Sequence, residues 1–447
     1  MKLRGLSWSA GGLLLAVWLG GCDAAAGHAT VHHGRTVGIE ARLNCPVIGS
    51  SGGRVFLQLA VSAPEAARSA RRPMNLSVVL DRSGSMSEEG KMHHAKAALC
   101  ALIDRLEERD LFSLVIYDDE IEVLRHACRV ADREHLKRII REIEPRGWTN
   151  LGGGLQTGLE LASQNARPEY VNRVVLLSDG LANRGVTDPE ELWRMAACYR
   201  ARGVSVSSMG VGLSFNENLM LGLAEQGGGN YYFIESSRSL ASVMGREFSA
   251  LCALVARNAT VDITLGSGVS VRDVIGYRYD LEGNRLRIHL GDLYGSDRRD
   301  ITLELHVPPG TGREVVAEGR VIYETESPRI AQGGSFHTSI RYSRELAEVD
   351  RNRDLEAQGR ADVAMSTRTV ERAMEALDEG RVSDAESALR EAKDVLAASP
   401  AAQSGAAASM VRAQEEKLDT YRTVLRNESA RAKKAIQYDN YQTQKNK

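Results

Sequence analysis

The stretch Leu76-Ser-Val-Val-Leu-Asp-Arg-Ser-Gly-Ser-Met86 decides the fold of this chain. Its apolar, β-branched beginning predicts a buried strand of a parallel sheet. The strand ends in Asp81, Ser83 and Ser85, three oxygen-bearing side chains at alternate positions, and a helical pattern follows over 91–103. In an open α/β sheet, ligands bind at the carboxyl ends of the strands. This loop is therefore a candidate site for a hard divalent cation such as magnesium, which prefers oxygen ligands.

Two later segments extend the pattern. Gly147-Trp-Thr149-Asn-Leu places a threonine before a helix, and Val174-Val-Leu-Leu-Ser-Asp179-Gly180 places an aspartate after an apolar strand. Together with the first loop, these segments resemble the metal-ion-dependent adhesion site of von Willebrand factor A domains. The resemblance covers residues 74–252 and implies an α/β fold with a doubly wound, mostly parallel, Rossmann-like sheet.

The resemblance also implies a role for each site residue. Ser83 and Ser85 are expected to bind the metal directly, Thr149 is the ligand that switches between two loop arrangements, and Asp81 and Asp179 supply the charge. The expected ion is Mg²⁺, with Mn²⁺ or Ca²⁺ as alternatives. Two carboxylates against a dication leave the expected site close to neutral. One coordination position is expected to stay open for an acidic side chain from a protein partner.

The first 22 residues read as an export signal. Lys2 and Arg4 precede an apolar run at 13–19, which is too short to span a membrane. The run ends in Leu-Gly-Gly-Cys22, which resembles the lipobox of bacterial lipoproteins. That resemblance implies lipidation of Cys22 and a lipid anchor in a membrane of the bacterial cell envelope, on its periplasmic or surface side. An ordinary secretory signal is the alternative.

The 447 residues are too many for one typical core, so we expect several parts. After the signal, residues 23–53 are expected to form a flexible tether, and residues 54–73 a strand and linker. Strand and helix patterns alternate over 74–252. The hydrophobic period then changes to two over 253–343, which predicts an antiparallel β-sandwich that the strand at 54–61 joins. Residues 344–447 favour a helical hairpin followed by a further helix, with a frayed end after 438.

Within the α/β part, tight connections and helix caps fix the expected boundaries. The short link Asp118-Asp119-Glu120 predicts a hairpin, and therefore one antiparallel edge. The predicted strands are 75–81, 111–117, 121–126, 172–178, 204–211 and 231–234. The predicted helices are 90–107, 132–142, 153–165, 188–202, 216–226 and 238–249.

The net charge and the cysteine spacing argue against a nucleic-acid partner and against a zinc site. A formal net charge of -2 gives no electrostatic reason to expect a nucleic-acid partner. Five cysteines remain besides Cys22, and none forms the CxxC pair that is typical of zinc sites. They are Cys45, Cys100, Cys128, Cys198 and Cys252. Their disulfide pairing is left open by the sequence.

Three hypotheses of enzymatic function are not supported, because the sequence lacks residues that each mechanism needs. A phosphoryl-transfer aspartate of the haloacid-dehalogenase type needs a second aspartate two positions later, where this chain has Ser83. A serine nucleophile needs an oriented base, and His93 and His94 lie on the following helix with no identifiable orienting group. The run of glycines at 152–154 lacks the lysine of a phosphate-binding loop. We therefore expect a binding protein and not an enzyme.

The leading hypothesis is an envelope-anchored protein that binds a protein partner, or adheres, through its metal site. The alternative is an accessory or scaffold subunit of an envelope or ATPase-linked complex, in which the α/β domain has a structural, non-adhesive role.

Overall fold

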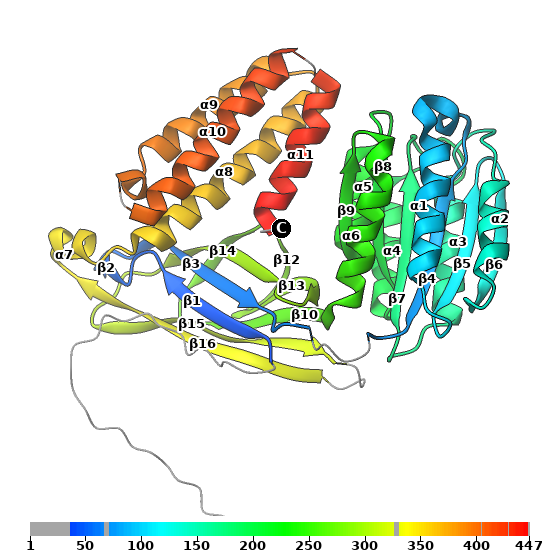
Figure 1. Ribbon diagram of the computed structural model, residues 1–447. Coiled ribbons are helices and arrows are strands. Elements are labelled where there is room, and N and C mark those ends of the chain that lie inside the picture. The colour runs from blue at the N-terminus through cyan, green and yellow to red at the C-terminus, as the bar shows by residue number, and fades with distance from the viewer. Residues whose placement is uncertain (1–35, 67–70, 326–329, 404, 428, 446–447) are drawn as a thin grey trace, which may run out of the picture.

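The computed structural model describes residues 36–66, 71–325, 330–403, 405–427 and 429–445. They form an α/β domain, a β-sandwich and a helical tail (Figure 1). The predicted signal segment and Cys22 lie outside the described residues. Among the described helices, none combines the length and apolar character needed to cross a bilayer.

The α/β domain is built on a six-stranded sheet in the order β6-β5-β4-β7-β8-β9. Its strands are β4 (Met74–Asp81), β5 (Leu111–Tyr117), β6 (Ile121–Arg129), β7 (Val171–Ser178), β8 (Ser205–Val211) and β9 (Gly228–Ile234). All neighbouring pairs are parallel except β5 and β6, which form the predicted antiparallel edge. The doubly wound, mostly parallel fold class is therefore confirmed.

Helices cover both faces of this sheet, because each central strand is apolar on both sides. Val78 packs into the core formed with α1 and α6, and Val79 packs into the core formed with α3, α4 and α5. Close packing of α3 depends on Gly158, where a Cβ atom would stand 2.2 Å from Cγ2 of Val79. The helices are α1 (Lys91–Arg105), α2 (Arg133–Arg141), α3 (Leu151–Gln164), α4 (Pro189–Ala201), α5 (Glu217–Gly227) and α6 (Leu240–Cys252).

The β-sandwich follows the α/β domain in sequence but also uses residues that precede it. One sheet has the order β1-β3-β14-β11 and the other β12-β13-β10-β15-β16-β2. The first sheet consists of β1 (Gly38–Leu43), β3 (Gly53–Ser62), β14 (Arg298–Val307) and β11 (Ser270–Ile275). The second consists of β12 (Arg278–Glu282), β13 (Arg285–Tyr294), β10 (Leu254–Leu265), β15 (Arg313–Glu324), β16 (Ile330–Ser343) and β2 (Val47–Gly49). Since β3 pairs with β14, the prediction that the strand at 54–61 joins the sandwich is confirmed.

The predicted flexible tether over 23–53 is wrong for its second half. Residues 38–43 form β1, which pairs antiparallel with β3, and residues 47–49 form β2 beside β16. The reason is packing, because Ile39, Ala41 and Leu43 alternate with polar residues and lie buried in the sandwich core.

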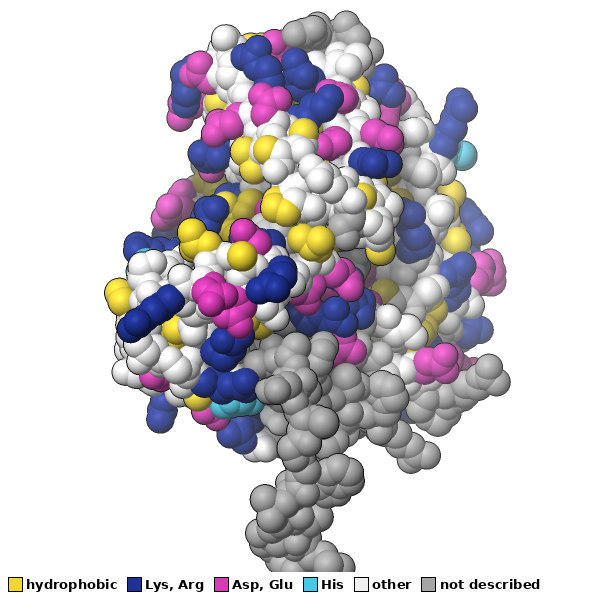
Figure 2. Space-filling view, turned by 90° about the vertical axis from the view of Figure 1, so that its left-hand side faces the viewer, with side chains coloured by type: hydrophobic (Ala, Val, Ile, Leu, Met, Phe, Trp, Pro, Cys, Tyr) yellow, Lys and Arg dark blue, Asp and Glu magenta, His cyan; other side chains and the backbone are white. Residues whose placement is uncertain are grey.

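The helical tail contains α7 (Leu346–Arg351), α8 (Leu355–Asp378), α9 (Val382–Ala397), α10 (Gly405–Asn427) and α11 (Ser429–Lys445). The predicted hairpin corresponds to α8 and α9, which pack against each other. On the face shown in Figure 2, basic and acidic side chains are intermixed over these helices.

The predicted frayed end is wrong for residues 438–445, because they belong to α11. That helix lies beside β9 of the α/β domain (Figure 1). The rings of Tyr438 and Tyr441 contact the ring of Tyr231, with ring centres 5.8 and 5.9 Å apart. Aromatic burial against another domain holds α11 in place.

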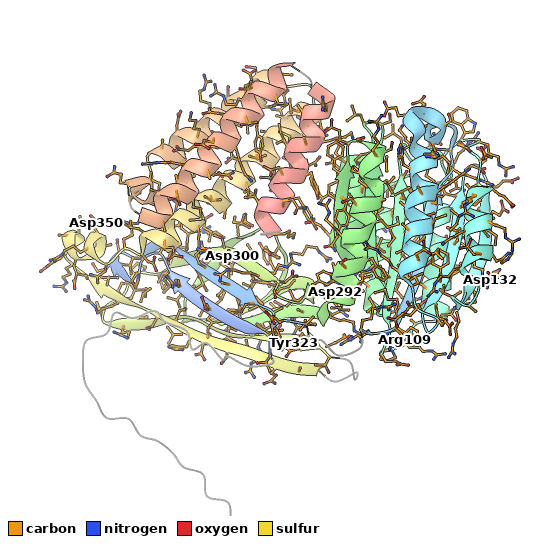
Figure 3. All side chains as sticks on the ribbon, in the orientation of Figure 1. Arg109, Asp132, Asp292, Asp300, Tyr323 and Asp350 are labelled. Atoms are coloured by element: carbon orange, nitrogen blue, oxygen red, sulfur yellow. The ribbon has the colours of Figure 1, made fainter. Side chains whose placement is uncertain are left out.

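Side-chain ion pairs join the three parts. Arg173 of β7 is buried and pairs with Asp292 of β13 at 3.0 Å. Arg360 of α8 pairs with Asp300 of β14 at 2.9 Å, and Figure 3 shows both aspartates at these junctions. In Figure 1, β4 begins at the end of the α/β domain nearest the sandwich and runs away from it. The carboxyl edge of the sheet therefore faces away from the β-sandwich.

Candidate metal centre

The five predicted metal ligands converge on the carboxyl edge of the sheet. Asp81 is the last residue of β4, and Asp179 directly follows β7, the parallel neighbour of β4. Both aspartates, Ser83 and Thr149 are buried, whereas Ser85 is half-buried. The parallel pairing explains this convergence, because adjacent parallel strands end at the same edge.

The serine hydroxyls link the loop after β4 to the loop after β7. The hydroxyl of Ser85 donates a hydrogen bond of 2.8 Å to Oδ1 of Asp179, and it lies 3.1 Å from the hydroxyl of Ser83. Ser85 therefore lies within hydrogen-bonding distance of two other predicted ligands, Ser83 and Asp179, before any ion is considered.

Thr149 completes the group from a third loop. Its backbone N–H donates to Oδ1 of Asn183 at 2.9 Å, which fixes it beside the loop after β7. A Cβ atom at Gly180 would lie 3.3 Å from Oγ1 of Thr149 and 3.7 Å from Oγ of Ser85. Both hydroxyls therefore border one small space, which the absence of a side chain at Gly180 keeps open.

Hydrogen bonds from neighbouring residues orient the carboxylate of Asp81. The backbone N–H of Ser83 donates to its Oδ1 at 2.8 Å, and the hydroxyl of Ser178 donates to its Oδ2 at 2.7 Å. The hydroxyl of Tyr117 lies 3.4 Å from the same Oδ2. Burial raises the pKa of Asp81 to about 6, against the opposing effect of these hydrogen bonds, and the nearby charge of Asp179 acts in the same direction as burial. A buried carboxylate of this kind favours a cation beside it.

Lys91 is a site residue that the sequence did not reveal. Its side chain is only 4% exposed, and its ammonium group donates to Oδ2 of Asp179 at 2.8 Å. It also lies 3.5 Å from the backbone oxygen of Ser85. A lysine in the first turn of a helix is ordinarily solvated, so no local pattern distinguishes it. Only the packing of α1 against the sheet places it here.

This donor set fits a hard divalent ion. It consists of carboxylate and hydroxyl oxygens, which magnesium prefers, and it lacks the thiolate or imidazole groups that favour zinc. The two carboxylates are partly offset by Lys91, so among the buried groups a bound dication would leave one excess positive charge, which faces the exposed carboxylate of Glu88 at 3.9 Å from Lys91.

The other sequence candidates lie apart from this donor set. His93 is exposed, and Nδ1 of the half-buried His94 lies 3.0 Å from the hydroxyl of Ser237. Asn150 caps α3 by accepting from the backbone N–H of Gly153. The five described cysteines are free, and no cluster of three or more His, Cys, Asp or Glu in the described parts of the chain is arranged to hold a metal.

Comparison with known proteins agrees with the fold of the α/β domain. The profile of the family described as "von Willebrand factor type A domain" matches residues 75–246. An Escherichia coli protein titled "Uncharacterized protein YfbK" is 27% identical over 256 residues, and "Uncharacterized protein sll0103" of Synechocystis is 26% identical over 280 residues. These matches cover 57% and 60% of this chain, but only 44% and 66% of the two relatives.

Among solved structures, one titled "von Willebrand factor type A from Catenulispora acidiphila" superposes with a TM-score of 0.71 at 15% identity. The superposition covers 93% of this chain and 99% of that one. The likeness therefore extends over all three parts of the fold.

Proposed function

Because residues 75–246 form a von Willebrand factor type A domain, we propose that this chain binds a divalent cation and uses it to recognise a protein partner. Mg²⁺ is the proposed ion, held by Asp81, Ser83, Ser85, Thr149 and Asp179. The observation that supports this most strongly is the convergence of Ser83, Ser85 and Asp179 through contacts of 2.8 and 3.1 Å.

The excess positive charge among the buried groups of the loaded site supports an acidic partner. With Lys91 paired to Asp179, a bound dication is not fully neutralised by the two aspartates. A carboxylate from a partner would restore neutrality and fill an open coordination position. This charge balance favours recognition of a Glu or Asp side chain. It gives no role to a nucleophile or base, so we propose a binding protein and not an enzyme.

Calorimetric titration of Mg²⁺ into the full chain tests the metal site. We expect saturable binding by the wild type and loss of binding in Ser83→Ala. The matched control is Ser87→Ala, whose exposed hydroxyl donates only to the backbone oxygen of Gly84. This control should bind Mg²⁺ like the wild type. Equal binding by all three proteins, or binding by none, would contradict the proposed site.

We further propose that the chain is anchored in the bacterial cell envelope through lipid on Cys22. The support is the apolar run that ends in Leu-Gly-Gly-Cys22. Mass spectrometry of the membrane fraction of an expressing bacterium should find a lipidated Cys22 at the mature amino terminus. The variant Cys22→Ser should leave that fraction, and retention of the variant would contradict lipid anchoring.

A further inference from the structure

The α/β domain exposes large apolar side chains at only one edge. Over residues 71–252, all of which are described, the large hydrophobic side chains with substantial exposure are Trp148 at 58%, Leu181 at 55% and Leu213 at 44%. All three lie on loops at the carboxyl edge of the sheet. Single exposed apolar residues are ordinary, but their restriction to the edge that holds the candidate metal site is not expected of a random distribution.

Two contacts join the loops of Trp148 and Leu181. Trp148 precedes the ligand Thr149, and Leu181 follows Gly180, which borders the site. The backbone N–H of Asn183 donates to the backbone oxygen of Thr149 at 3.2 Å. The guanidinium carbon of Arg184 lies 5.7 Å from the centre of the Trp148 ring, which stacks the two loops together.

Leu213 reaches the site from the loop after β8. Its neighbour Gly212 lies against Lys91, because a Cβ atom at Gly212 would stand 3.2 Å from Cε of the lysine. Lys91 in turn holds Asp179. Each of the three apolar side chains is therefore adjacent in sequence to a residue that is a site ligand or contacts the site.

We propose that Trp148, Leu181 and Leu213 form an apolar rim around the metal site, and that this rim selects a protein segment in which a Glu or Asp is flanked by large apolar side chains. The proposal rests on the proposed function, since the metal would bind the acidic group. Burial of the flanking side chains against the rim would exclude water from the charged contact, and hot spots of protein interfaces are arranged in this way.

A protein segment fits this surface better than a membrane does. The apolar side chains stand singly on three loops and do not form a continuous insertion surface.

The test uses the full chain and a displayed peptide library with a fixed central Glu and randomised flanking positions. Selection is done with Mg²⁺ and, in parallel, with a chelator. The affinity of a selected peptide is then measured by fluorescence polarisation for the wild type, Trp148→Ser and Leu181→Ser. The matched control is Leu281→Ser, which removes a side chain of 45% exposure from β12 of the sandwich.

We expect Mg²⁺-dependent peptides with large apolar residues beside the Glu. Their affinity should fall by about tenfold or more in each rim variant, as expected for loss of a buried apolar contact, and should not change in Leu281→Ser. The calorimetric affinity for Mg²⁺ should be the same in all four proteins.

Three outcomes would overturn the proposal in distinguishable ways. Selected peptides without a preference for apolar residues would contradict the proposed role of the rim but would leave the proposed function standing. If the same peptides are selected with Mg²⁺ and with the chelator, metal-dependent recognition is contradicted as well. Binding of the wild type, but not of Leu181→Ser, to phosphatidylglycerol vesicles would replace the protein partner with a membrane.

Discussion

Asp81 is the residue through which the metal site should respond to pH. Its pKa in the metal-free fold is about 6, above the ordinary 3.8. This group therefore stabilises the metal-free fold fully below about pH 4, and the contribution is lost as the pH rises through about 6. Only the carboxylate binds metal, so Mg²⁺ affinity should fall by about tenfold per pH unit below pH 6. Calorimetry at several pH values measures this, and affinity that is constant from pH 7 to 5 would contradict it.

Lys91 should oppose the metal through its charge. In Lys91→Met, we expect Mg²⁺ to bind about tenfold or more tightly, because a positive charge close to the ion is removed. The metal-free variant should also unfold more easily, since Asp179 loses its buried partner. Calorimetry and urea unfolding measure the two effects. Lys96→Met, which removes a lysine paired with the exposed Glu144, is the control, and weaker Mg²⁺ binding by Lys91→Met would show that Lys91 instead positions Asp179.

Among the residues of the candidate metal site, the sequence predicted those that belong to a spaced pattern. It missed those whose positions depend on tertiary packing. Asp81, Ser83 and Ser85 follow a strand at alternate positions, so their proximity could be predicted. Lys91 and Ser178 could not, because their contacts with the aspartates depend on how α1 and β7 lie against β4.

Helix α3 positions the loop that contains Thr149. The close packing of α3 against β4 depends on Gly158. In Gly158→Ala, the new methyl group would overlap Val79, so we expect a loss of about 1–3 kcal/mol in the free energy of unfolding. Gly245→Ala on α6 is the control, because its methyl group meets only the movable end of Arg105. That change should stabilise the fold by up to about 1 kcal/mol through helix propensity. Urea denaturation distinguishes the two, and equal effects would contradict the packing account.

Elements with strong periodicity were predicted well, and short ones were not. The alternating strands and helices of 74–252 were placed close to their observed bounds. The strand β1 was missed although Ile39, Ala41 and Leu43 alternate with polar residues, because six residues gave too weak a signal beside a polar leader. Its pairing with β3 and its packing in the sandwich core depend on the tertiary structure, which a local sequence pattern does not show.

The three parts of the molecule are held together in part by α11. The ammonium group of Lys434 is buried and donates to the backbone oxygen of Phe215 at 2.6 Å and to Glu217. Burial alone would raise the pKa of Glu217, but the ammonium groups of Lys433 and Lys434 hold it below its ordinary value. This contribution is therefore present above about pH 4.5 and is lost as the pH falls through the lower folded-state pKa.

In Lys434→Met, we expect α11 to detach more often from the α/β domain. Loss of a hydrogen bond to a charged group costs about 1.5–3 kcal/mol, so amide exchange in α11 should become about ten- to a hundredfold faster. The control Lys393→Met breaks a partly exposed pair with Asp419 inside the tail and should change little. Unchanged exchange in α11 would contradict a stabilising role for this contact.

The relative placement of the parts was beyond sequence reasoning. Residues after 438 are polar and read as a frayed end, yet Tyr441 is buried against Tyr231 of another part. Polar composition predicts exposure only where no neighbouring surface can satisfy the polar groups, and the sequence gives no information about that neighbour.

We propose above all that the carboxyl edge of the sheet binds a divalent ion. Anomalous diffraction from crystals of the full chain soaked in Mn²⁺, a heavier substitute for Mg²⁺, tests it most directly. We expect one strong anomalous peak in direct contact with the hydroxyl oxygens of Ser83 and Ser85. A peak elsewhere with none at these hydroxyls, or no peak in crystals that tolerate the soak, would show that this edge does not bind a divalent ion.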